Sequence, residues 1–206
     1  MRTGERPGLL ARALRLEYLT VGWNLLEGVI AVAAAAVSGS VALLGFGIDS
    51  FVEIASGSVL IWRLRAERRT ADEAAVEALE RRAMRLVGLA FVLLAIYVSV
   101  DAVVALVEAE RPDTSLVGLG LAAVSIPVMS WLARAKRRVA VAMGSKALEA
   151  DAVQTAACWW LSLAVLAGVG LNALFGWWWA DPLAAIAISG FLLREGWEAW
   201  GGWHED

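Results

Sequence analysis

Long apolar stretches separated by short polar segments dominate the sequence. A helix needs about 20 mostly apolar residues to cross a bilayer, and six segments meet this requirement. They run approximately over residues 18–37, 41–62, 86–107, 116–132, 148–171 and 180–197. The apolar runs are continuous, whereas the strands of a membrane barrel alternate between apolar and polar residues. The pattern therefore predicts an all-α, polytopic membrane protein with six transmembrane helices.

The overall composition supports this class. Hydrophobic residues make up 60% of the chain and charged residues 19%, whereas soluble domains average about 45–50% and about 25%. The net charge of −3 provides no basic surface for a nucleic acid, and the single cysteine, Cys158, has no partner for an internal disulfide. We therefore exclude a soluble enzyme, a nucleic-acid-binding protein and a disulfide scaffold. We expect an integral protein of the plasma (inner) membrane, in contact with the lipid bilayer.

The basic residues predict the orientation. Of the 18 basic residues, all except Arg111 lie before the first predicted span, in the segments after the second and fourth spans, or near the end of the sixth. The segment assigned to the loop between the fourth and fifth spans contains Arg134, Lys136 and Arg138. Cytoplasmic loops carry the excess of lysine and arginine, so both termini are predicted to be cytoplasmic. We expect residues 1–206 to form one membrane domain with no soluble domain.

Two carboxylates in the second predicted span indicate a site. Asp49 and Glu53 are spaced i and i+4, which stacks them on one helix face about 5–6 Å apart. Two such groups in a medium of low dielectric constant cannot both stay ionised without a cation. Either one of them carries a proton or a metal ion lies between them. The alternative is a pair of carboxylates that hydrogen-bond to neighbouring helices and serve packing.

The fifth predicted span contributes a complementary stripe. Asp151, Gln154 and Cys158 are spaced i, i+3 and i+7, which places them on one helix face. Carboxylate, amide and sulfur ligands together suit a borderline-soft divalent ion. Two alternatives remain open, because Gln154 can orient a carboxylate instead of binding the metal, and Cys158 can be a small buried apolar residue.

Three further polar residues lie within predicted spans. Asn24 and Glu27 are one turn apart on the first span, and the short connection Ser38-Gly39-Ser40 makes that span an antiparallel neighbour of the second. They either line a water path or brace the site. Asp101 in the third span has no partner near it in the sequence and is either a helix–helix hydrogen-bond anchor or part of a proton path.

Taken together, these residues resemble the cation diffusion facilitators, a family of divalent-metal/proton antiporters with six spans. The resemblance rests on Asn24 and Glu27, on the Ser-Gly-Ser connection, and on the segments 49–53 and 149–158. The family pairs an acid-x-x-x-acid motif on span two with a His/Asp-x-x-x-Asp motif on span five. Asp49 and Glu53 match the first motif. Gln154 and Cys158 occupy the positions of the second and depart from it, so Asp151 is expected to replace the missing carboxylate.

With this departure, the sequence is similar to a divergent short branch of the family. That branch lacks the C-terminal cytoplasmic domain and includes the transmembrane-protein-163 type of zinc transporter. The resemblance implies a secondary active transporter that exports divalent metal ions from the cytoplasm in exchange for protons. It also implies a homodimer, here held by membrane helices. Carboxylate and sulfur ligands favour Zn²⁺, then Cd²⁺ and Co²⁺, and leave Fe²⁺ and Mn²⁺ possible. We expect no prosthetic group.

The sequence leaves other functions open. The chain is either such a transporter, a non-transporting metal sensor or structural partner in the membrane, or a carrier for a non-metal substrate. A membrane-embedded metalloenzyme would normally use histidine ligands, and the single histidine, His204, lies outside every predicted span. We therefore predict that the protein is not an enzyme.

Overall fold

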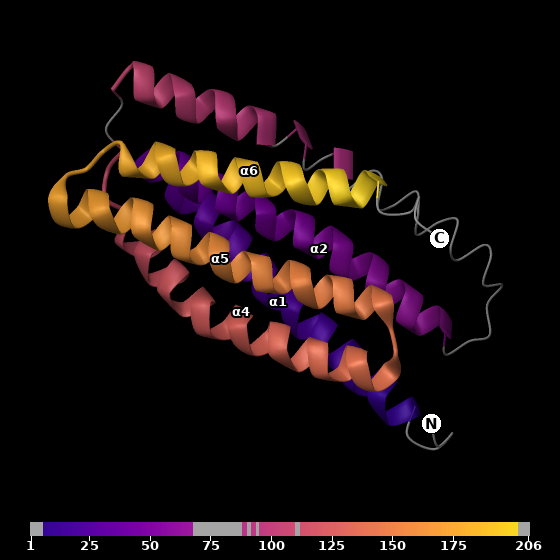
Figure 1. The fold of residues 1–206 in the computed structure, drawn as a ribbon. Helices are drawn as coiled ribbons and strands as arrows, with labels where there is room; N and C mark the ends of the chain where they lie inside the picture. The colour runs from indigo at the N-terminus through magenta and orange to yellow at the C-terminus, as the bar shows by residue number, and fades with distance from the viewer. Residues whose placement is uncertain (1–5, 68–87, 90–91, 94, 110–111, 202–206) are drawn as a thin grey trace.

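The computed structural model describes residues 6–67, 88–89, 92–93, 95–109 and 112–201. This part of the chain is helical and contains no strand, which confirms the predicted all-α class. The helices are α1 (Arg6–Ser38), α2 (Val41–Glu67), an unlabelled helix described over Ala95–Val107, α4 (Leu116–Met143), α5 (Lys146–Phe175) and α6 (Ala180–Gly201) (Figure 1).

Four of the described helices are long and apolar enough to cross a membrane. These segments are Pro7–Ser38, Val41–Arg65, Leu116–Met143 and Ala147–Phe175. The segment Ala95–Val107 is apolar but shorter, and α6 is not in this group. The structure therefore supports four of the six predicted spans. The other two spans and the orientation remain predictions.

The helices lie side by side in one bundle (Figure 1). Helix α1 packs against α2 and α4, and α5 packs against α4, α2 and α6. A tight turn at Gly39, with a φ of 72°, makes α1 and α2 antiparallel neighbours as predicted. The beginning of α1 and the end of α6 lie at the same end of the bundle (Figure 1).

A buried aspartate joins the first turns of α2 and α6. The Ser40 hydroxyl donates to Asp181 Oδ1 at 2.5 Å, and the Ala42 N–H donates to Asp181 Oδ2 at 3.3 Å. Ser40 Oγ also accepts a hydrogen bond from the Leu43 N–H at 3.1 Å, so it caps α2. A carboxylate at a helix N-terminus is stabilised by the helix dipole. This contact therefore fixes the start of α6 on the start of α2.

Glycines let α1 and α2 approach closely. A Cβ atom at Gly47 would lie 2.8 Å from Val32 Cγ2 and 3.0 Å from the Val32 backbone nitrogen. A Cβ atom at Gly28 would lie 3.1 Å from the carbonyl oxygen of Gly47. Small residues at such crossings bring two backbones together and shorten the distance that polar side chains must reach across the interface. The close packing of α1 on α2 thus prepares the polar contacts between them.

The structure corrects the assignment of Lys136 to a loop. Helix α4 continues to Met143, well past the predicted end of the span at residue 132, and the Lys136 side chain is fully buried. Lys136 continues the helical spacing of Ser125, Met129 and Leu132, the buried face of α4, so it points into the bundle. The other predicted basic positions at Arg2, Arg68, Arg69, Arg81, Arg82, Arg85 and Arg111, and His204 with them, lie outside the described residues.

We predict that Gly47→Ala destabilises the protein by about 1–3 kcal/mol, because the added methyl group overpacks the α1–α2 crossing. Gly22→Ala on α1 is the matched control, since a Cβ atom there meets no atom within 4 Å. Thermal unfolding in detergent measures both. Equal stability of the two variants would contradict the described crossing.

Candidate functional site

Four helices bury polar side chains on faces that meet inside the bundle. On α1 these are Glu17, Thr20, Asn24 and Glu27, whose spacing of i, i+3, i+7 and i+10 follows one helix face. The other helices contribute Asp49, Ser50, Glu53 and Ser56 from α2, Ser125 and Lys136 from α4, and Thr155, Cys158 and Ser162 from α5. Each of these residues is buried, so the bundle has a polar interior.

The structure brings two predicted site residues from different helices into contact. The Cys158 thiol on α5 donates a hydrogen bond to Asp49 on α2, with Sγ 2.9 Å from Oδ2. Asp49 is 2% exposed and Cys158 is 4% exposed. A carboxylate and a sulfur atom therefore meet away from water at the α2–α5 interface.

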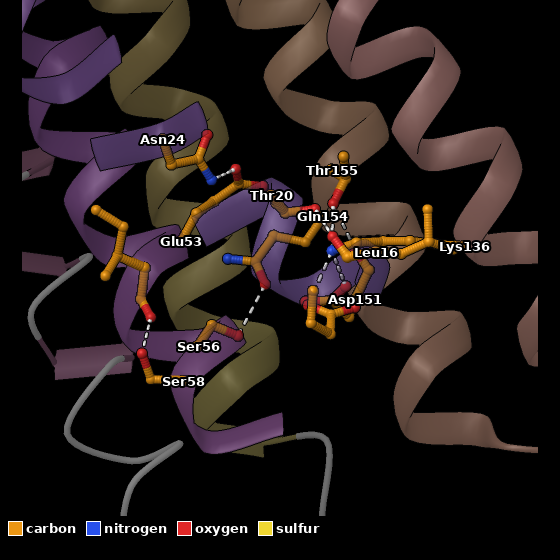
Figure 2. Close-up of polar contacts among 12 residues, drawn as sticks. Leu16, Thr20, Asn24, Glu53, Ser56, Ser58, Lys136, Asp151, Gln154 and Thr155 are labelled. Atoms are coloured by element: carbon orange, nitrogen blue, oxygen red, sulfur yellow. Dashed lines mark hydrogen bonds and ion pairs between the residues drawn. The ribbon is translucent and has the colours of Figure 1, made fainter. Parts of the chain in front are cut away.

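Glu53 lies one turn from Asp49 on the same face of α2 and reaches α1. The Asn24 amide donates a hydrogen bond to Glu53 Oε2 (Figure 2). A second contact of this kind joins α1 to α4, because the Ser125 hydroxyl donates to Glu27 Oε1. These contacts join α1 to α2 and to α4, and a bracing role for Asn24 and Glu27 stays a prediction. A role for them in a water path stays a prediction.

Gln154 lies at the same interface but has a different partner. Its side chain is half-buried, and Gln154 Oε1 accepts a hydrogen bond from the Ser56 hydroxyl on α2 at 3.1 Å (Figure 2). The amide is thereby oriented by α2. This contact is compatible with a supporting position beside the Asp49–Cys158 pair.

Asp151 belongs to a separate charged cluster around Lys136. The Lys136 ammonium on α4 donates to Asp151 Oδ2 on α5 at 2.5 Å and to Glu17 Oε2 on α1 at 3.1 Å. It also donates to Thr155 Oγ1 at 3.2 Å. Figure 2 shows Lys136 reaching from α4 to Asp151 and Thr155. Asp151 is thus paired with the buried Lys136 ammonium group and lies two helical turns from Cys158 along α5.

Asp101 lies apart from these contacts. It is half-buried on the helix Ala95–Val107, which is held to α6 by a hydrogen bond of 2.9 Å between the Ser99 and Ser189 hydroxyl groups. Asp101 takes part in none of the hydrogen bonds and ion pairs given above for the described residues of the polar interior. Its two predicted roles, as a helix anchor or in a proton path, both stay predictions.

The predicted ligands do not form a closed metal cage in this arrangement. Among the described residues, no three His, Cys, Asp or Glu side chains are grouped so that they could hold a metal ion. Asp49 and Cys158 contact each other, while Glu53 is hydrogen-bonded to Asn24. Coordination of an ion by all three ligands would therefore require Glu53 to approach the Asp49–Cys158 pair, for which its second oxygen, Oε1, is not used by Asn24.

The charges of the interior favour cations. Lys136 is the one fully buried basic side chain among the described residues. The acidic side chains of the same interior are Glu17, Glu27, Asp49, Glu53 and Asp151. A single charged group at the bilayer centre costs about 2.5–3.5 kcal/mol on insertion scales. An interior with this excess of carboxyl groups must therefore be neutralised by protons or by bound cations.

Glu17 and Lys136 are functional candidates that the sequence analysis missed. Glu17 precedes the predicted first span by one residue, and Lys136 follows the predicted fourth span. The helical spacing of buried polar residues could have indicated both of them. Glu17 continues the stripe of Asn24 and Glu27, and Lys136 lies at i+11 from Ser125 on the buried face of α4.

Comparison with known proteins agrees with this architecture and chemistry. Residues 19–200 match the cation efflux transmembrane domain, so the chain belongs to the cation efflux family. This confirms the resemblance to the cation diffusion facilitators and identifies the protein as a transmembrane protein. The chain is also similar to a protein of Synechocystis sp. (strain ATCC 27184 / PCC 6803 / Kazusa) called "Uncharacterized transporter sll1263", with 28% identity over 181 residues. The match covers 86% of this chain and 58% of that relative, so the chain spans little more than half of the relative's length.

We predict that Lys136→Met destabilises the protein by about 3–5 kcal/mol in metal-free buffer, because it leaves two buried carboxylates without their cation. Arg138→Met is the matched control, since Arg138 is exposed on the same helix. Chemical unfolding in detergent measures both variants. A further change of Glu17→Gln and Asp151→Asn should restore most of the lost stability. Equal stability of the Lys136 and Arg138 variants would show that the buried ion pairs contribute nothing.

Proposed function

We propose that the protein is a secondary active transporter that exports divalent metal cations, chiefly Zn²⁺, from the cytoplasm in exchange for protons. The observation that carries this proposal is the buried contact between Asp49 on α2 and Cys158 on α5. Membership of the cation efflux family and the excess of carboxyl groups in the interior support it. A transporter, rather than an enzyme, accounts for a polar interior built from helices of membrane length.

The proposed transport site consists of Asp49, Glu53 and Cys158. Two carboxylates and a thiolate are ligands that Zn²⁺ and Cd²⁺ accept readily. Gln154 lies one turn from Cys158 and supports the site through its contact with Ser56. Asp151 was predicted as a ligand, and its contact with Lys136 supports a role in the neighbouring charged cluster. A direct ligand role for Asp151 or Gln154 stays a prediction.

Proton exchange follows from the chemistry of the thiol. The Cys158 thiol carries the proton that it donates to Asp49. A metal ion binds the thiolate and not the thiol, so binding must release that proton. When the site opens to the other side of the membrane, protons compete for the same ligands and release the ion. Each transported ion would therefore be linked to at least this proton.

We further propose six membrane spans with both termini in the cytoplasm, in one membrane domain over residues 1–206. Alternating access would then be a rocking of helices around a site near the middle of the membrane. Because Asp49 and Glu53 lie on α2 and Cys158 on α5, movement at the α2–α5 interface would open and close the site. We expect a homodimer that is held by membrane helices in the plasma membrane.

We predict that Asp49→Asn abolishes Zn²⁺ flux in proteoliposomes under a pH gradient, because the neutral amide removes a ligand charge at the centre of the site. Glu149→Gln is the control, since it removes an exposed acid from the same helix as Cys158. Its flux should stay within about twofold of the wild type. Flux of the Asp49 variant at the wild-type rate would refute the assigned site.

We predict that Cys158→Ser changes the selectivity of the transporter. Serine replaces a soft sulfur ligand with a hard oxygen ligand, so transport of Cd²⁺ relative to Mn²⁺ should fall about tenfold or more. Competition between the two ions in the flux assay measures this ratio, with Ser162→Ala, one turn further along α5, as the control. An unchanged ratio would mean that Cys158 does not bind the transported ion.

A further inference from the structure

The Lys136 ammonium occupies a position surrounded by oxygen atoms from two other helices. Glu17 Oε2 comes from α1, and Asp151 Oδ2 and Thr155 Oγ1 come from α5, at 3.1, 2.5 and 3.2 Å from Nζ. These three contacts use all three protons of the ammonium group. The Thr155 hydroxyl donates to the carbonyl oxygen of Asp151, which leaves a lone pair of Oγ1 directed at the cation. The geometry is that of a small cation held by oxygen ligands.

The oxygen atoms of this cluster exceed what the ammonium group can satisfy. Glu17 is fully buried, and its second oxygen, Oε1, has no hydrogen-bond partner among the described residues. A buried carboxylate oxygen without a partner loses its hydration at a cost of about 1–3 kcal/mol or more. A cation that binds both oxygens of Glu17 would satisfy this atom, which one ammonium proton cannot do.

We propose that Glu17, Asp151 and Thr155 form a second cation-binding position. The Lys136 ammonium group occupies this position, and a hard divalent ion binds there when the ammonium group moves away. The ligands are two carboxylates and a hydroxyl group, with no sulfur. Such all-oxygen ligands suit Mn²⁺, Mg²⁺ and Ca²⁺. The chemistry of this position thus differs from that of the Asp49–Cys158 pair.

The second position lies at a different depth in the bundle. Asp151 precedes Cys158 by seven residues on α5, which corresponds to about 10 Å along the helix axis. The contacts Asn24–Glu53 and Ser56–Gln154 lie beside the Lys136 cluster (Figure 2). The existence of the second position does not depend on the proposed transport function.

Electron paramagnetic resonance on the full chain tests this proposal by measuring the number of Mn²⁺ ions bound per chain. Asp49→Asn and Cys158→Ser are introduced throughout, so that the first position does not contribute. In this background we expect Lys136→Met to bind about one Mn²⁺ more per chain than the parent. Adding Glu17→Gln should weaken this extra binding about tenfold or more, because it removes one of the two carboxylates. Arg138→Met, which alters an exposed residue of α4, should bind no extra ion.

Two results would overturn the proposal. The first is Mn²⁺ binding by the Lys136→Met chain that equals binding by the parent. The second is extra binding that persists after Glu17→Gln and Asp151→Asn. If Lys136→Met does not fold in metal-free buffer, it is purified with Mn²⁺, and Lys136→Gln is purified in parallel. Recovery of folded chain that depends on Mn²⁺ supports the proposal, and failure of both variants at every Mn²⁺ concentration contradicts it.

Discussion

Polar side chains buried among helices of membrane length have no water to bond to, so they must satisfy one another across helix interfaces. The main contacts of the interior follow this constraint: Asn24–Glu53 joins α1 to α2, and Cys158–Asp49 joins α5 to α2. Lys136 joins α4 to both α1 and α5. The same contacts hold the bundle together and assemble the site. A metal ion that binds there must therefore replace contacts that also stabilise helix packing, which links ion binding to helix movement.

Two of these contacts place a proton donor against a carboxylate. The Cys158 thiol donates to Asp49, and the Lys136 ammonium donates to Asp151 and Glu17. In each case the donor occupies a place that a cation can take. The two donors differ in one respect, because the thiol must lose its proton to bind a metal, whereas the ammonium must move away. The first arrangement supports exchange of a metal ion for a proton, and the second places a positive charge between α1, α4 and α5.

The sequence was sufficient for the helical class, the antiparallel pairing of α1 and α2, and the common faces of Asp49 with Glu53 and of Asp151 with Cys158. Helical spacing determines these features, and it can be read along one chain. The partners across interfaces could not be predicted, because spacing tells which face a residue shares but not which helix it meets. Lys136 was assigned to a loop because a charged residue usually marks the end of an apolar span. Here α4 continues, and the charge is neutralised by Glu17 and Asp151.

We propose that the Asp49–Cys158 contact marks a metal site with mixed sulfur and oxygen ligands. X-ray absorption at the zinc edge, on the full chain loaded with one equivalent of Zn²⁺, tests it most directly. We expect one sulfur neighbour of the zinc at about 2.3 Å together with oxygen neighbours at about 2.0–2.2 Å. The sulfur neighbour should disappear in Cys158→Ser. A zinc shell of oxygen and nitrogen atoms alone in the wild-type protein would contradict the assignment of Cys158 as a ligand.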